Sequence, residues 1–263
     1  MKPNPRAWLC CAAIVAVAVG APAQAAIKTQ LIDYKQGDAT LQGYLAYDDA
    51  KTQKRPGIVV YHDWTGVSDN VKQRARMLAQ LGYVAFAADI YGKGVHPQIG
   101  PDAAAESGKY MKDRATLLAR AKAGYDVLRN NAMVDQARLV AIGYCFGAAP
   151  ALDLARSGAD LKSVVALHGV LSAPEQNPKM IKAKVLVLHG ADDPLVKQEA
   201  VQAFQKEMKD AAVDYEVVLY GGALHAFTDK RYNDPAHGVK YDEKADKRSW
   251  IAMRDFLRET VGR

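Results

Sequence analysis

The sequence predicts an α/β domain with a mostly parallel central sheet covered by helices on both faces. Three observations lead to this prediction. Short, almost continuous apolar segments recur along the chain, amphipathic segments with helical periodicity separate them, and no internal repeat or low-complexity linker interrupts the alternation. Strands that are apolar throughout are typical of a sheet buried on both faces, because a strand with one solvated face alternates between apolar and polar residues.

Each element is predicted from its local pattern. Near the N-terminus, segments 29–34 and 40–47 are expected to form an antiparallel pair. The apolar strand segments that follow are 57–62, 83–89, 138–143, 163–169, 184–190 and 214–222. Helical periodicity predicts helices over 68–82, 107–131, 198–211 and 244–261. The polar segments rich in Gly, Pro and His, which we expect to be loops that line a site, are 92–102 and 229–241.

The first 25 residues have the pattern of a cleavable signal peptide. They begin with two basic residues, continue as an apolar segment over 7–19, and end in the small residues Ala23-Gln24-Ala25. The apolar segment is shorter than the roughly 20 residues of a membrane-spanning helix. We expect cleavage after Ala25, with Ala23 as the alternative, and export to the periplasm. Residues 26–263 are then expected to form a single domain without stable membrane association.

The charge of the chain excludes some partners. The formal net charge is +6, and the two basic residues of the signal peptide, Lys2 and Arg6, contribute +2 of it, which leaves +4 for the mature chain. No long Lys/Arg block and no basic stripe interleaved with aromatic residues is present, so a nucleic acid partner is not expected. We expect a small-molecule substrate and a monomer or weak homodimer.

The number of cysteines draws attention to one of them. Cys10 and Cys11 lie in the signal peptide, and Cys145 is the only cysteine that remains after cleavage. Structural cysteines of exported proteins normally pair, because the compartment is oxidising. An unpaired thiol is then either a small buried hydrophobic residue or a functional group.

The sequence around Cys145 favours a function. Cys145 lies between Gly143 and Gly147, after an apolar strand and before an expected helix. A sharp strand-to-helix turn exposes its central side chain at the carboxyl end of the sheet, and flanking glycines let the turn approach neighbouring strands. The start of the helix directs N–H groups to the same place and favours a thiolate. The pattern therefore predicts a nucleophile.

Two partners of such a nucleophile follow in the expected order. An acid is expected in the loop after strand 184–190 and a histidine in the loop after strand 214–222. Asp192 and Asp193 occupy the first loop, and His225 occupies the second. We favour Asp193, three residues after Gly190 and followed by Pro194, and keep Asp192 as the alternative. Each residue alone has an ordinary structural explanation, but the three in order predict a Cys-His-Asp triad.

The remaining site predictions concern the oxyanion, the pocket and cofactors. The expected oxyanion donors are the backbone N–H groups of Phe146 and Trp64. Aromatic residues beside the motifs are expected to form the pocket wall, namely Tyr91, Tyr144 and Phe227, whereas Trp250 is expected in the core. The other histidines considered, His62, His96, His168 and His237, show no metal-binding spacing, so we expect no metal and no cofactor.

Together, these motifs resemble those of the dienelactone hydrolase family, whose members have the α/β-hydrolase fold. The resemblance rests on the segments YHDWTGVSDN, DIYGKG, GYCFGAAPAL, LHGADDPLV and LHAFTD, and it covers nearly the whole mature chain. It implies that Cys145 is the nucleophile, Asp193 the acid and His225 the base. Asp63 lies where the family has a glutamate that holds the resting thiol, and its side chain is one methylene shorter.

The resemblance also bears on the substrate. Members of the family use arginines to bind a substrate carboxylate, one of them shortly after the histidine. Here Asp229 lies at that place, with Lys230 and Arg231 beyond it, and an acid there is expected to repel an anionic lactone. The reaction implied is hydrolysis of a carboxylic ester or lactone through a thioester. The alternatives are a non-catalytic ligand-binding or interaction protein that retains the fold, and a thiol sensor.

Overall fold

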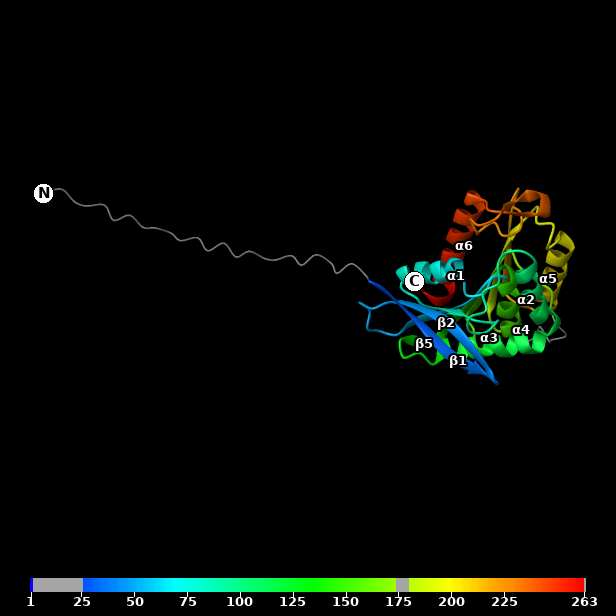
Figure 1. Cartoon of the computed structure of the whole chain (residues 1–263). Coiled ribbons are helices and arrows are strands. Elements are labelled where there is room, and N and C mark those ends of the chain that lie inside the picture. The colour runs from blue at the N-terminus through cyan, green and yellow to red at the C-terminus, as the bar shows by residue number, and fades with distance from the viewer. Residues whose placement is uncertain (2–25, 174–179, 263) are drawn as a thin grey trace.

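The computed structural model describes residue 1, residues 26–173 and residues 180–262, and its centre is an eight-stranded sheet (Figure 1). The predicted signal peptide, apart from residue 1, lies outside the described residues. The strands are β1 Ile27–Gln36, β2 Ala39–Asp48, β3 Arg55–Tyr61, β4 Val84–Ala88, β5 Val134–Tyr144, β6 Ser163–Leu167, β7 Lys184–Gly190 and β8 Tyr215–Tyr220. Their order in the sheet is β1-β2-β4-β3-β5-β6-β7-β8.

Most strand pairs are parallel, as predicted. The antiparallel pairs are β1 with β2 and β2 with β4, and every pair from β4 through β3 to β8 is parallel. The antiparallel pair expected over 29–34 and 40–47 is confirmed as β1 and β2. Because the parallel strands run in one direction, the segments that leave β3, β5, β6, β7 and β8 all emerge at the same edge of the sheet, where ligands bind in open α/β sheets.

Helices cover both faces of the sheet (Figure 1). On one face lie α1 Asp69–Gln80 and α6 Glu243–Val261, and on the other lie α2 Pro101–Lys112, α3 Arg114–Arg129, α4 Ala148–Arg156 and α5 Gln198–Asp210. Successive residues of β3 serve the two faces in turn: Ile58 and Val60 pack in the core under α1 and α6, and Val59 packs in the opposite core. All three are fully buried, and burial of each such side chain stabilises the fold by about 1.5–3 kcal/mol. The strands read as continuous apolar runs because both of their faces are covered.

One predicted helix is wrong. Residues 107–131 were expected to form one helix, but the chain breaks at Asp113, between α2 and α3. The backbone of Asp113 leaves the helical region, with φ −117° and ψ 76°, and its side chain accepts a hydrogen bond from the N–H of Thr116 at 3.0 Å. Asp113 is therefore the N-cap of a new helix, because an aspartate at this position satisfies an N–H group that has no partner within the helix.

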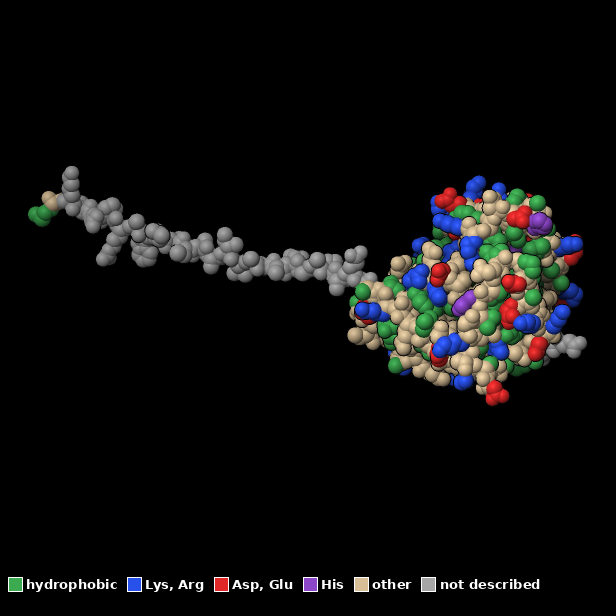
Figure 2. Space-filling model, in the orientation of Figure 1, with side chains coloured by type: hydrophobic (Ala, Val, Ile, Leu, Met, Phe, Trp, Pro, Cys, Tyr) green, Lys and Arg blue, Asp and Glu red, His purple; other side chains and the backbone are tan. Residues whose placement is uncertain are grey.

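The surface and the two expected loops complete the fold. Figure 2 shows acidic and basic side chains interspersed over the visible face, without a large block of either sign. Among the described residues no helix is long and apolar enough to cross a membrane. The helix α2 begins at Pro101, so the last two residues of the expected loop 92–102 are helical. The expected loop 229–241 contains a small hairpin of β9 Asn233–Asp234, the short helix η3 Pro235–His237 and β10 Val239–Lys240.

Candidate active site

Cys145 lies at a sharp turn between β5 and α4. Its φ is +53°, a left-handed conformation that is rare for a residue with a side chain. A Cβ atom added at Gly143 would lie 2.1 Å from the carbonyl oxygen of Gly147, and one added at Gly147 would lie 2.3 Å from the carbonyl oxygen of Tyr61. Both glycines are therefore required for the close approach of the turn to itself and to β3. The turn presents the thiol at the carboxyl edge of the sheet, as predicted.

The structure brings His225 and Asp193 to the thiol. The Sγ of Cys145 lies 3.1 Å from Nε2 of His225, and Nδ1 of His225 lies 2.8 Å from Oδ2 of Asp193. The three residues follow β5, β8 and β7, whose carboxyl ends meet at one edge. This chain of hydrogen bonds has the order of a nucleophile, a base and an acid that orients the base.

The two neighbouring aspartates differ in orientation, and only Asp193 contacts His225. Asp193 is buried, and its Oδ1 accepts hydrogen bonds from the N–H groups of Leu195 and Val196 at 2.8 and 3.0 Å. Asp192 is exposed, and its backbone N–H donates to the carbonyl of Ala223. Asp193 is thus held with one oxygen on the backbone and the other on His225.

The hairpin of β9 and β10 supports the loop that carries His225. The N–H of His225 donates to the carbonyl of Gly238 at 3.0 Å, and the N–H of Lys240 donates to the carbonyl of His225 at 3.0 Å. Gly238 has a φ of +78°, and a Cβ atom added there would lie 2.2 Å from Cγ of Pro194. The hairpin therefore packs against the loop of Asp193 while it holds the loop of His225, so it sets the spacing between acid and base.

The charges of the triad are coupled. Burial by itself lowers the pKa of His225, but electrostatic interaction with Cys145 and the hydrogen bond with Asp193 raise it to about 10. Burial by itself raises the pKa of Asp193, but its hydrogen bond with His225 and the charge of that ring hold it below the usual range. The arrangement favours an imidazolium at neutral pH, between a carboxylate and the sulfur.

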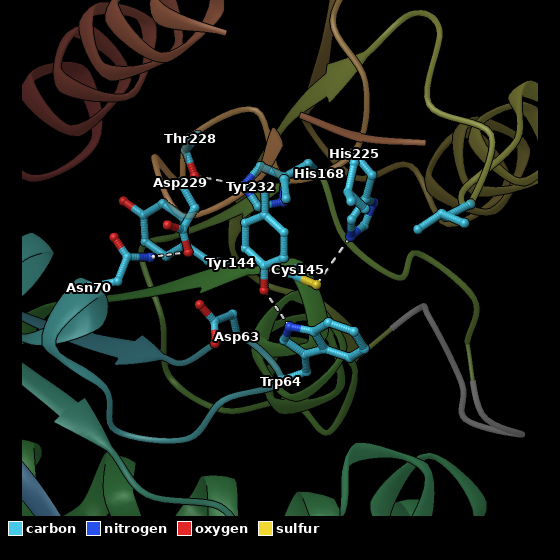
Figure 3. Close-up of a pocket in the computed structure, with 13 residues that line it drawn as sticks. Asp63, Trp64, Asn70, Tyr144, Cys145, His168, His225, Thr228, Asp229 and Tyr232 are labelled. Carbon is cyan, nitrogen blue, oxygen red and sulfur yellow. Dashed lines mark hydrogen bonds between the residues drawn. The ribbon is translucent and has the colours of Figure 1, made fainter. Parts of the chain in front are cut away.

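A pocket opens in front of Cys145 (Figure 3). It encloses about 440 Å³ of space that no atom fills, solvent at its mouth included. Its lining residues are Asp63, Trp64, Asn70, Tyr144, Cys145, His168, Leu195, His225, Ala226, Thr228, Asp229, Tyr232 and Val239. The wall thus combines aromatic and aliphatic side chains with a few polar and acidic ones, which is the usual composition of a small-molecule site.

Two of the three expected wall residues lie elsewhere. Tyr144 lines the pocket, but Tyr91 and Phe227 do not. Phe227 is fully buried and packs edge-on against His168 and Tyr220, and the ring of Tyr91 packs against Phe146 while its hydroxyl donates to the carbonyl of Trp64. These expectations are wrong because proximity to a motif in sequence does not decide which way a side chain points. Trp250, expected in the core, is half-buried and packs at its border.

Sequence reasoning missed several residues of the pocket wall, among them Tyr232 and His168. The hydroxyl of Tyr232 accepts a hydrogen bond from Nε1 of Trp64, which comes from a loop 168 residues away in the chain (Figure 3). His168 follows β6 and lies edge-on to His225, with 5.5 Å between ring centroids, and its Nε2 lies 2.7 Å from Oγ1 of Thr228. Burial, followed by the charge of His225, lowers the pKa of His168 well below 6.5, so this ring is neutral. The one available signal for His168 was its place directly after a strand.

Asp63 and Asp229 meet a common partner. Oδ1 of Asp63 accepts hydrogen bonds from the N–H and hydroxyl of Thr65 at 2.7 and 2.5 Å, and its Oδ2 accepts one from Nη2 of Arg231 at 2.7 Å. The same guanidinium donates to both carboxylate oxygens of Asp229. The hydrogen bonds of the Asp63 carboxylate thus go to Thr65 and Arg231, and Asp229, at the place where the family has an arginine, is paired with the same Arg231. Within the described ranges, no group of three or more His, Cys, Asp or Glu side chains is placed to hold a metal ion.

The chain is similar to several known proteins. A dienelactone hydrolase-like promiscuous phosphotriesterase from metagenomic libraries has 39% sequence identity and a TM-score of 0.85, with 90% of this chain and 100% of that chain covered. A structure titled m3DLH has 40% identity and a TM-score of 0.84, with coverage of 89% and 99%. A protein of Aquifex aeolicus, provisionally named a carboxymethylenebutenolidase, is 23% identical over 234 residues, which cover 87% of this chain and 97% of the relative.

The family itself is shown by a longer match. The model of the Dienelactone hydrolase family matches residues 41–261, which span the sheet from β2 to the end of α6 and include all three triad positions. The expected α/β-hydrolase fold is confirmed by the parallel sheet and by these structural neighbours. The chain therefore belongs to the dienelactone hydrolase family and is a hydrolase of ester or lactone bonds.

Proposed function

We propose that this protein is an exported enzyme that hydrolyses a small carboxylic ester or lactone through the triad of Cys145, His225 and Asp193, with a thioester intermediate. Two contacts carry the proposal: Sγ of Cys145 lies 3.1 Å from Nε2 of His225, and Nδ1 of His225 lies 2.8 Å from Oδ2 of Asp193. Cys145 and His225 both line the pocket described above. A nucleophile, a base and an orienting acid in contact are what acyl transfer requires.

In the acylation step, the sulfur of Cys145 attacks the carbonyl carbon, so the C–S bond forms and the carbonyl oxygen becomes an oxyanion. The N–H groups of Phe146 and Trp64 stabilise that oxygen; removal of one such donor typically costs about 2.7–4 kcal/mol of transition-state stabilisation. The tetrahedral intermediate collapses, the C–O bond breaks, and the imidazolium of His225 gives its proton to the departing alkoxide. The raised pKa of His225 supports this role, because the ring holds a proton at neutral pH.

In the deacylation step, His225 is neutral and accepts a proton from a water molecule as the oxygen of that water attacks the thioester carbon. The C–S bond breaks, the acid product leaves, and the thiolate and imidazolium are restored. Asp193 keeps the ring in the orientation in which Nε2 faces the sulfur, because its Oδ2 binds Nδ1 and its Oδ1 is fixed by two backbone N–H groups.

The decisive experiment compares wild type with Cys145→Ala on short p-nitrophenyl esters, small lactones and the phosphotriester paraoxon. Paraoxon is included because the relative with 39% identity is described as a promiscuous phosphotriesterase. Wild type is expected to turn over at least one carboxylic ester or lactone, and the variant none above buffer. Acid quench of a single turnover followed by mass measurement is expected to find one acyl group on Cys145. Equal rates for the two proteins would refute the proposal, and binding without turnover would support the non-catalytic alternative.

Two neighbouring residues give a matched control. Asp193→Asn removes the acid of the triad and is expected to lower kcat roughly 10²-fold or more. Asp192→Asn removes the same charge one residue away, on an exposed side chain, and is expected to leave kcat unchanged. Equal losses in both variants would mean that Asp193 acts only through general structure.

Export is tested separately from catalysis. The expected signal peptide predicts that the mature protein begins at residue 26 and is released with the periplasmic fraction. N-terminal sequencing of the protein from that fraction checks both points, and an intact N-terminus on a protein that stays in the cytoplasm would contradict them. Size-exclusion chromatography checks the expected monomer or weak homodimer.

A further inference from the structure

The pocket in front of Cys145 carries negative charge. Of the charged side chains that line it, Asp63 and Asp229 are acids, and no Lys or Arg belongs to the lining described above. His168 is neutral because of its burial. The imidazolium of His225 is already engaged between the sulfur and Asp193. A substrate carboxylate that enters this pocket therefore finds two carboxylates in the wall and no free cation.

The guanidinium of Arg231 is engaged through all three of its nitrogens. Nη2 of Arg231 lies 2.7 Å from Oδ2 of Asp63 and 2.5 Å from Oδ2 of Asp229, and its Nε lies 3.0 and 2.9 Å from the two oxygens of Asp229. Its Nη1 lies 3.3 Å from Oγ1 of Thr65. Each of the three nitrogens thus already donates to an acceptor, and two acids share one cation, so the group carries a net charge of −1.

The acids are fixed as well as paired. Asp63 and Asp229 are 5% and 4% exposed. Thr65 donates two hydrogen bonds to Asp63, and Asp229 accepts further hydrogen bonds from the N–H of Arg231 at 3.0 Å and from Nδ2 of Asn70 at 3.2 Å. The cluster is therefore preorganised, and a ligand carboxylate must displace a bidentate carboxylate to reach Arg231. Planar bidentate pairs of this kind are among the stronger ion pairs in proteins.

We propose that the cluster of Asp63, Asp229 and Arg231 selects uncharged esters or lactones over those that carry a carboxylate. Within this cluster, Asp229 and Arg231 determine the specificity. The inference rests on the proposed function and names its substrate class. A like charge brought into a partly desolvated site is strongly disfavoured. The aromatic and aliphatic wall formed by Trp64, Tyr232 and Leu195 suits an uncharged substrate.

The test uses two substrates that differ only in a distant charge. p-Nitrophenyl hydrogen adipate ends in a carboxylate, and p-nitrophenyl adipamate ends in the neutral amide of similar size. Release of nitrophenolate, corrected for the buffer rate, gives kcat/KM for each. Wild type is expected to prefer the neutral substrate by roughly tenfold or more at low ionic strength, and added salt is expected to reduce the ratio.

Two variants are expected to move the preference in opposite directions. Asp229→Asn removes one negative charge and frees donors of Arg231, so the ratio is expected to shift toward the anionic substrate by roughly tenfold. Arg231→Met removes the cation and leaves two acids, so the ratio is expected to shift further toward the neutral substrate. Asp69→Asn is the matched control: Asp69 is fully exposed on α1 beside Asn70, and we expect less than roughly a twofold change.

A second measurement does not depend on turnover. The rates at which iodoacetate and iodoacetamide alkylate Cys145 give an anionic-to-neutral ratio for each protein, and His225 contributes equally in all of them. This ratio is expected to rise in Asp229→Asn and fall in Arg231→Met. Equal kcat/KM for the two wild-type substrates, or shifts of the two variants in the same direction, would overturn the inference. Loss of all Cys145-dependent turnover with opposite shifts in alkylation would instead refute the proposed function alone.

Discussion

Replacement of Cys145 by alanine is expected to lower the pKa of His225. In the wild type, burial disfavours the imidazolium, while the charge of the sulfur and the hydrogen bonds with Asp193 and Cys145 favour it, and the pKa is about 10 against an ordinary 6.5. At about 1.36 kcal/mol for each pH unit, this difference corresponds to about 5 kcal/mol in favour of the protonated ring. The ring is 7% exposed, so solvent screens the interaction little.

In Cys145→Ala the largest favourable interaction is absent, whereas the burial that opposes protonation remains. We expect the pKa of His225 to fall by at least about two units, with Asp193 left as its main support. Two-dimensional NMR of the ¹⁵N-labelled imidazole between pH 5 and pH 11 measures it directly. Asp192→Asn, which leaves the triad intact, is the control and is expected to retain the wild-type value. A ring that still titrates near pH 10 without the sulfur would refute the attribution of the raised pKa to Cys145.

The same interaction has a consequence for stability. The pKa of His225 is higher in the folded protein than in the unfolded chain, so its contribution is fully present below about pH 6.5 and is lost as the pH rises through about 10. Urea unfolding at pH 6.5 and pH 10 is therefore expected to show a larger loss of free energy of unfolding for wild type than for Cys145→Ala. Identical losses in the two proteins would contradict the assignment.

Two further predictions concern glycines at the site. Gly147→Ala places a Cβ atom 2.3 Å from the carbonyl oxygen of Tyr61 and is expected to lower the free energy of unfolding by about 1–3 kcal/mol and to reduce kcat; unchanged urea unfolding and turnover would contradict this. Gly238→Ala combines a positive φ with a Cβ atom 2.2 Å from the ring of Pro194, whereas Gly222→Ala has nearly the same φ and no atom within 4 Å. Both are expected to lose about 1–2 kcal/mol from backbone strain, but only Gly238→Ala is expected to lose more and to lower kcat/KM; equal effects would exclude the hairpin as the spacer of acid and base.

Much of the sheet was predictable because its strands are apolar on both faces. The segment of β7, Lys184–Gly190, stands out from its polar surroundings without any knowledge of its neighbours. The break at Asp113 was not recognised, since the residues on both sides of it keep helical periodicity and an aspartate is also an ordinary surface residue of a helix. Local capping chemistry decided the outcome there, and periodicity does not report it.

In the candidate site, too, some features follow from local sequence and others depend on contacts between distant residues. Cys145, Asp193 and His225 were identifiable because each follows a strand of known order, and parallel strands end at one edge. The ion pair of Asp63 with Arg231 could not be predicted, because 168 residues separate the two and their contact depends on how two loops fold over the sheet. Tyr91 and Phe227 were misplaced for a related reason: a residue next to a motif points into the pocket or into the core according to backbone geometry that the sequence alone does not specify.

The positive φ of Cys145 is set by the packing of the main chain in the turn and does not depend on the sulfur atom. The close approaches that Gly143, Gly147 and Gly169 permit are all to backbone atoms or to Ala148, and none of them involves Sγ. The turn therefore positions the side chain at residue 145 without using its sulfur atom. Replacement of Cys145 by serine is therefore expected to leave the turn intact, and a hydroxyl would then occupy the place of the thiol.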